Sequence, residues 1–159
     1  DKLEKDKVRV LKNDYYPNLS SKKLISDGYL QDKRDNVHGK TVDVSLITLD
    51  KEIRNTHVKK KKSYRHNRKV IYQDDGTINM GTSYDVFDPL SCSSCKSLNI
   101  EEINNRDLLR DKMEKHGFVQ SKLVWWKFTY SQDQEDDIEG RDKPGEASHH
   151  ASSFRIISV

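Results

Sequence analysis

The hydrophobic residues of this chain gather in short segments that are separated by long polar stretches. Residues 41–50 alternate β-branched and polar side chains, which predicts a strand. Residues 122–130 form the most apolar segment and are predicted as a second strand, and residues 70–72 as a short edge strand. Together these segments favour a small antiparallel sheet.

Two further segments carry helical patterns and are expected to flank this sheet. Residues 102–116 place apolar side chains on one face and are followed by Gly117, a residue type that commonly ends helices. Residues 19–27 predict a shorter helix that ends near Gly28. Residues 1–13 fit either a short exposed helix or a frayed arm. The fold class that we expect is therefore α+β.

The composition limits the size of the core. Of the 159 residues, 33% are hydrophobic and 35% are charged. This length suits one domain, and the apolar content is close to the lower limit for a folded chain. We expect the ordered domain to cover residues 1–130. The acidic, polar residues 131–159 are predicted to be mostly unordered, with residues 154–159 as a strand that docks onto the domain.

Membrane association is not expected from this sequence. No apolar run approaches the roughly 20 residues that span a bilayer. The segment from Asp1 to Lys7 alternates charges and has no apolar signal-peptide core. These observations favour a cytoplasmic protein.

Three blocks of sequence, in this order, resemble the VanX-type D-alanyl-D-alanine dipeptidases. The blocks are residues 15–18 with 24–29 and 39–46, residues 80–88, and residues 105–113 with 117–118 and 125–126. The family consists of zinc enzymes that share their fold with other D,D-peptidases and with the hedgehog signalling domain. The resemblance therefore implies a hedgehog/D,D-peptidase-like fold, a zinc cofactor and D-Ala-D-Ala or a related dipeptide as the partner molecule.

In that family, the motif Ser-x-His-x-x-Gly-x-x-x-Asp supplies two zinc ligands. A later Glu-x-Trp-His motif supplies the general base and the third ligand. Three protein ligands leave a fourth position for water. The zinc lowers the pKa of this water, and the glutamate takes its proton during attack on the peptide carbonyl.

The resemblance breaks down at the residues that carry this chemistry. Of the ligand positions only Asp43 is retained, because Asn36 and Lys127 stand at the other two. Val124 stands at the position of the general base and cannot move a proton. Lys127 would place a cation beside the metal ion, and the two charges repel. Asp85 matches the carboxylate that holds the free ammonium group of the substrate, and it is retained.

These departures predict a degenerate, shortened relative without zinc-dependent hydrolysis that retains weak recognition of a dipeptide or peptidoglycan fragment through Asp85. The sequence also shows no counterpart to the N-terminal portion that carries a catalytic arginine in the family. An active zinc dipeptidase is the alternative, and it would need Asp43, a new base and unfamiliar ligands such as His38, His149 or Cys92. His38 could substitute for the ligand lost at Asn36, since the two side chains share a face of an extended segment.

Two residue pairs have both an ordinary and a functional interpretation. Cys92 and Cys95 form a Cys-x-x-Cys pair, which fits two loop thiols better than half a metal site or a redox pair. Trp125 and Trp126 would point to opposite faces of a strand. One is then expected in the core, and the other either packs there too or lines a cleft.

A basic insertion covers residues 54–69. It contains seven lysines and arginines between residues 59 and 69, which is typical of a solvated loop. A third hypothesis is that this loop binds nucleic acid or an acidic partner. The net charge of only +3 and the acidic residues after Tyr130 argue against a dedicated nucleic-acid binder.

Overall fold

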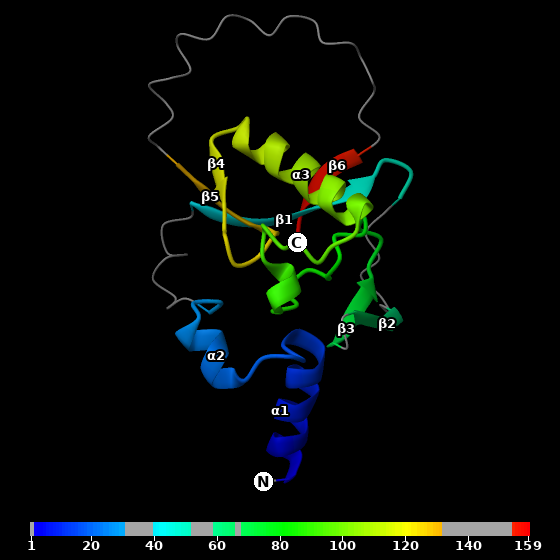
Figure 1. Cartoon of the computed structure of the whole chain (residues 1–159), viewed down its shortest axis with the longest axis vertical. Helices are drawn as coiled ribbons and strands as arrows, with labels where there is room; N and C mark the ends of the chain where they lie inside the picture. The colour runs from blue at the N-terminus through cyan, green and yellow to red at the C-terminus, as the bar shows by residue number, and fades with distance from the viewer. Residues whose placement is uncertain (1, 31–39, 52–58, 66–67, 132–153) are drawn as a thin grey trace, which may run out of the picture.

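The computed structural model describes residues 2–30, 40–51, 59–65, 68–131 and 154–159 (Figure 1). Its main sheet has four antiparallel strands in the order β4-β5-β1-β6, and a separate sheet is formed by β2 and β3. The elements are α1 (Lys2–Tyr15), α2 (Ser21–Ser26), β1 (Thr41–Thr48), β2 (Lys59–Arg65), β3 (Arg68–Asp74), the 3-10 helix η1 (Pro89–Ser91), α3 (Ile100–Glu114), β4 (Phe118–Gln120), β5 (Lys127–Tyr130) and β6 (Phe154–Ser158). This α+β architecture confirms the predicted fold class.

The central strand of the main sheet is β1. It pairs with β5 through its first half and with β6 through its second half. Its residues Val44 to Ile47 are all buried, so both faces of the strand are covered here. The predicted strand at residues 41–50 is therefore confirmed, as is the predicted docking strand near the C-terminus.

Helix α3 packs against this sheet and has well-defined ends. At its start the side chain of Asn99 accepts a hydrogen bond from the N–H of Glu102, whose carboxylate accepts one from the N–H of Asn99. This reciprocal pair is a capping box. The helix ends before Gly117, whose φ of +81° favours glycine. The helix predicted at residues 102–116 is thus confirmed.

One hydrophobic cluster joins α3, the sheet and the connecting segments. Trp125 and Trp126 both lie inside it, each with 1% of its surface exposed. The chain turns at these residues instead of continuing as a strand, so the predicted strand at 122–130 is confined to β5. The prediction that the tryptophans point to opposite faces of a strand is wrong for the same reason. The buried members are Val44, Leu46, Met80, Leu109, Met113, Val124, Trp125, Trp126 and Phe128.

The basic segment forms strands where the sequence predicted a loop. Strand β2 contains the four consecutive lysines and pairs in register with β3, from Lys59 opposite Asp74 to Arg65 opposite Arg68. The short strand predicted at residues 70–72 lies within β3. It belongs to this two-stranded sheet, however, and not to the main sheet as expected.

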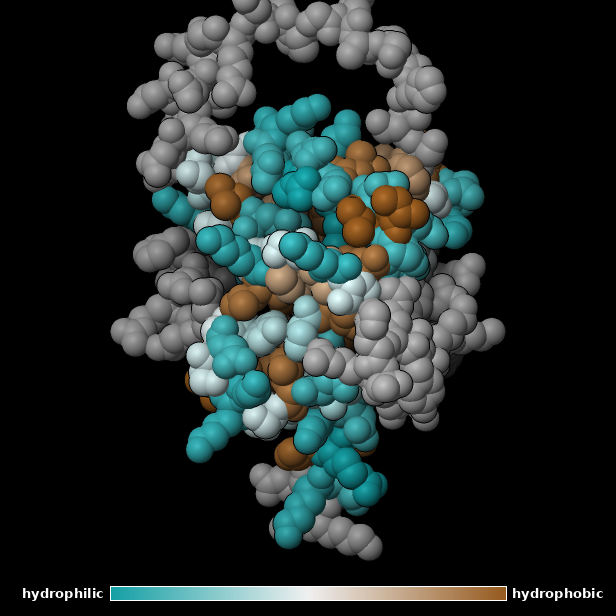
Figure 2. Space-filling model, viewed as in Figure 1, coloured by the Kyte–Doolittle hydropathy of each residue, from teal (hydrophilic) through white to brown (hydrophobic). Residues whose placement is uncertain are grey.

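The N-terminal helices lie at the opposite end of the molecule from α3 (Figure 1). Residues 1–13 were compatible with a helix or an arm, and the structure shows the helix α1. Its end is attached to the rest of the fold by the N–H of Phe87, which donates to the carbonyl of Tyr15 at 2.7 Å. Figure 2 shows mainly hydrophilic side chains over α1 and α3. Within the described residues, no helix combines the length and the apolar character needed to cross a bilayer.

A single buried arginine connects α3 with the segment that precedes it. Arg106 is 3% exposed and lies on the face of the helix that points inward. Its guanidinium donates to the carbonyls of Met80 (2.7 Å), Leu90 (2.9 Å) and Cys92 (2.8 Å). Because these carbonyls lie at the two ends of residues 80–92, the arginine fixes how that segment folds.

We expect Arg106→Met to lower the free energy of unfolding by about 3–5 kcal/mol, because buried carbonyls lose a charged donor. Urea denaturation followed by circular dichroism measures this change. The matched control is Arg110→Met, one turn further along α3, where a partly exposed ion pair with Asp107 is lost. This control substitution should lower the free energy of unfolding by at most about 1 kcal/mol. Equal losses in the two variants would contradict the role assigned to Arg106.

Candidate functional site

Asp43 and Lys127 form an ion pair across two neighbouring strands. They are directly opposite partners in the antiparallel pair of β1 and β5, so their side chains leave the sheet on the same face. The Nζ of Lys127 donates to Oδ1 of Asp43 at 2.8 Å. About a quarter of each side chain is exposed, at 25% for Lys127 and 27% for Asp43. The pair is thus partly shielded from water.

Asp85 brings a second carboxylate to this ion pair. Burial and, after it, the negative charge of Asp43 raise the pKa of Asp85 to about 6, and the positive charge of Lys127 acts in the opposite direction. The backbone of Asp85 has a φ of +59°, in the left-handed region that aspartate tolerates better than most residues. Asp43, Lys127 and Asp85 therefore form one electrostatic cluster, contributed by β1, β5 and the segment before η1.

Tyr84 lies beside this cluster. Burial raises the pKa of its hydroxyl to about 12, with further contributions from the negative charges of Asp43 and Asp85. Its ring meets the ring of Trp126 edge-on, with 5.7 Å between the centroids. Tyr84 thus remains a neutral hydroxyl next to the carboxylates. The sequence analysis did not select it, although its position next to Asp85 was visible.

The segment that carries Tyr84 and Asp85 is held at several points besides Arg106. Asp88 accepts a hydrogen bond from the N–H of Leu90 at 2.8 Å and one from the amide of Asn18 at 2.6 Å. Thr82 accepts from the indole N–H of Trp125 at 2.9 Å. Gly81 has a φ of +86°, and a Cβ there would lie 2.6 Å from the side chain of Leu98. These contacts fix the path of the chain on both sides of Asp85.

Among the remaining positions of the expected zinc centre, the structure describes only Val124. Val124, which the resemblance places at the position of the general base, is 2% exposed and belongs to the hydrophobic core. Asn36, His38 and His149 lie outside the described residues. In the described part of the chain, no three side chains of His, Cys, Asp or Glu lie close enough together to hold a metal ion.

Among the described residues, Asp43, Val124 and Lys127 do not fit the zinc centre that the resemblance implies. One of the two carboxylate oxygens of Asp43, Oδ1, already accepts the hydrogen bond from Lys127. A zinc ion at this carboxylate would have to displace the lysine or lie beside its positive charge.

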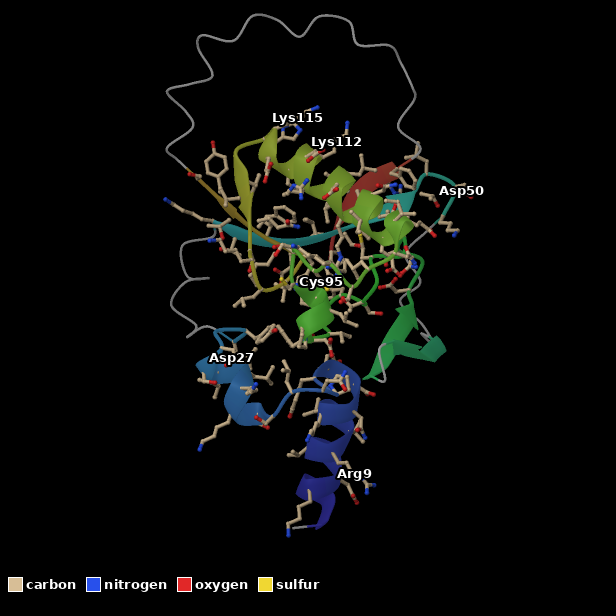
Figure 3. All side chains as sticks on the ribbon, in the orientation of Figure 1. Arg9, Asp27, Asp50, Cys95, Lys112 and Lys115 are labelled. Carbon is tan, nitrogen blue, oxygen red and sulfur yellow. The ribbon has the colours of Figure 1, made fainter. Side chains whose placement is uncertain are left out.

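The Cys-x-x-Cys pair lies in a turn after η1, and Figure 3 labels Cys95 there. Both thiols are free and half-buried. The N–H of Cys95 donates to the carbonyl of Cys92 at 3.2 Å, and this carbonyl also accepts from Arg106. The turn fits the interpretation of two loop thiols.

We expect the raised pKa of Asp85 to make the protein less stable as the pH rises from about 4 to about 6. The carboxyl has an ordinary pKa of 3.8, and the fold raises it to about 6, so the folded state binds the proton more tightly. This stabilisation is complete below pH 3.8 and is lost as the pH passes the folded pKa of about 6.

Thermal melts of the wild type and Asp85→Asn between pH 4 and 7 measure this effect. Asparagine also tolerates the left-handed backbone, so the variant removes the titrating group with little strain. The melting temperature of Asp85→Asn should not fall with rising pH as that of the wild type does. Asp111→Asn, an exposed change on α3, should keep it. An equal fall in both variants would assign the effect to another group.

Comparison with known proteins confirms the resemblance. A family model described as "D-ala-D-ala dipeptidase" matches residues 52–143. The D-alanyl-D-alanine dipeptidases of Enterococcus faecalis and Enterococcus faecium are each 27% identical to this chain over 119 residues. Each match covers 75% of this chain and 48% of the relative, so the chain spans about half the length of these curated relatives. Because the family model covers more than half of the sequence, the chain belongs to the D-Ala-D-Ala dipeptidase family.

Proposed function

We propose that this protein binds the amino-terminal end of D-Ala-D-Ala, or of a related dipeptide or peptidoglycan fragment, without zinc-dependent hydrolysis of the peptide. The observation that carries this proposal is the hydrogen bond of 2.8 Å from Lys127 to Asp43. The lysine engages the one retained ligand of the family's zinc centre, whereas the second carboxylate, Asp85, stands beside this pair.

The proposed loss of hydrolysis follows from two residues. A dication about 4 Å from the ammonium of Lys127 would be repelled by about 8 kcal/mol at the effective dielectric constant of a protein surface. Val124 offers no atom that accepts a proton from water, so a water molecule at this place would not be activated. Lys127 therefore disfavours binding of the family's metal ion, and Val124 cannot act as the family's general base.

The proposed recognition of an amino terminus follows from Asp85. Its carboxylate is half-buried, and partial burial strengthens its attraction for a positively charged group. Tyr84 is half-buried beside it and offers both a ring and a neutral hydroxyl. Two relatives are named D-alanyl-D-alanine dipeptidase, which supports a dipeptide of this type as the ligand.

We expect the full chain to bind D-Ala-D-Ala in isothermal titration calorimetry, and Asp85→Asn to weaken this binding at least tenfold because the charged partner of the ammonium is lost. Binding should also weaken below pH 6, where Asp85 takes up a proton. N-acetyl-D-Ala-D-Ala, which has no ammonium group, is the matched ligand control. Equal binding of the two ligands, or no binding of the dipeptide, would overturn the proposed recognition.

The absence of hydrolysis is tested separately. The full chain is incubated with D-Ala-D-Ala and zinc, and free D-alanine is measured. We expect no release above that of the Asp43→Asn variant. Zinc-dependent release that disappears in this variant would establish the active zinc dipeptidase with altered ligands instead.

A further inference from the structure

We propose that Lys127 is the resident cation of the site formed by Asp43 and Asp85, and that it determines which charged ligand the site accepts. With the lysine in place, the site accepts one ammonium group and excludes divalent metal ions. The ammonium part of this inference rests on the proposed function. The exclusion of metal ions deepens the part of the proposed function that concerns zinc, and it is tested with metal ions alone, without dipeptide.

The sheet holds the ammonium group of Lys127 against the carboxylate of Asp43. Asp43 and Lys127 face each other in the register of β1 and β5. The backbone pairing continues beside them, because the N–H of Val44 donates to the carbonyl of Trp126 at 2.9 Å. Trp126 is almost fully buried and precedes Lys127 directly, so the start of the lysine side chain is fixed by the core. The contact of 2.8 Å is thus built into the sheet.

The charges of the cluster explain the selectivity. Two carboxylates and one ammonium leave the site with a single negative charge, which one ligand ammonium neutralises. Without Lys127, the negative charges of Asp43 and Asp85 would lack the counter-ion that the lysine supplies. Paired carboxylate oxygens are the ligands that hard divalent cations prefer. The presence of Lys127 therefore decides whether this site binds an amine or a metal ion.

An ordinary cross-strand ion pair would not have this effect. Exposed pairs contribute little, and one partner can be removed without creating a new binding property. Asp43 and Lys127 are three-quarters covered, and a further carboxylate lies close enough for its pKa to respond to both. Removal of the lysine leaves the negative charge of Asp43 next to that of Asp85, and a divalent ion can then restore neutrality.

The experiment compares metal binding by the wild type, Lys127→Met and Lys127→Arg, each freed of metal with a chelator. Methionine keeps the length of the side chain without its charge, whereas arginine keeps the charge. Calorimetric titration with manganese chloride and with zinc chloride, at pH 7.5 and without dipeptide, measures affinity and stoichiometry. We expect Lys127→Met to bind one ion at least tenfold more tightly than the wild type, and Lys127→Arg to resemble the wild type.

The additional change Asp43→Asn tests whether the metal ion gained by Lys127→Met is bound by Asp43. The double variant Asp43→Asn, Lys127→Met should lose the gain and should show no rise in melting temperature when metal is added. If Lys127→Met does not fold, Lys127→Gln replaces it, because glutamine can still donate to Asp43 but carries no charge. Tight metal binding by the wild type, no gain in the neutral variants, or a gain that persists without Asp43 would each overturn the inference.

The outcome is independent of the dipeptide measurements. A wild type that does not bind D-Ala-D-Ala would overturn the proposed function, yet the metal titrations would still give their result. Conversely, neutral variants that gain no metal site would overturn the role of Lys127, while binding of the dipeptide at Asp85 would stand.

Discussion

The guanidinium of Arg106 is the contact on which the candidate site depends most. It joins α3 to both ends of residues 80–92, and this segment carries Tyr84 and Asp85. A chain with 33% hydrophobic residues has little apolar surface with which to hold such a segment in place. Directional hydrogen bonds from a buried charge supply the order that a larger core would otherwise provide.

The pairing of Asp43 with Lys127 shows how the sheet fixes the chemistry of the candidate site. The sheet still brings the retained aspartate and its neighbour together, because strand register depends on the core and not on a metal ion. A lysine then satisfies the aspartate from within the chain. The positive charge beside Asp43 is thus part of the chain itself.

The sequence predicted those elements whose patterns are local. The alternation of residues 41–50 and the helical face ending at Gly117 each identify one element, and both exist. The apolar residues around Trp125 correctly predicted that this segment is buried. They did not predict its backbone conformation, because a tight turn in the core and a strand can be equally apolar. The lysines from Lys59 indicated a loop by their charge, whereas their conformation depends on pairing with β3.

The site was predictable in its residues but not in its contacts. Asp43, Asp85 and Lys127 were all selected from the sequence. The contact between Asp43 and Lys127, however, depends on the register between two strands that lie far apart in the chain, which no local pattern encodes. Arg106 left a weaker signal, as a charge on the inward face of a predicted helix, where it requires partners.

The arrangement of β1 between β5 and β6 also has a consequence for synthesis of the protein. The partner of the second half of β1 is Phe154–Ser158, which leaves the ribosome long after Thr48. At usual translation rates this delay is about 5–20 s. During that time the segment with the apolar residues Val44, Leu46 and Ile47 lacks its partner strand, and such an unpaired strand edge promotes aggregation. A nascent chain of this protein therefore has a period in which its own fold does not yet protect its central strand.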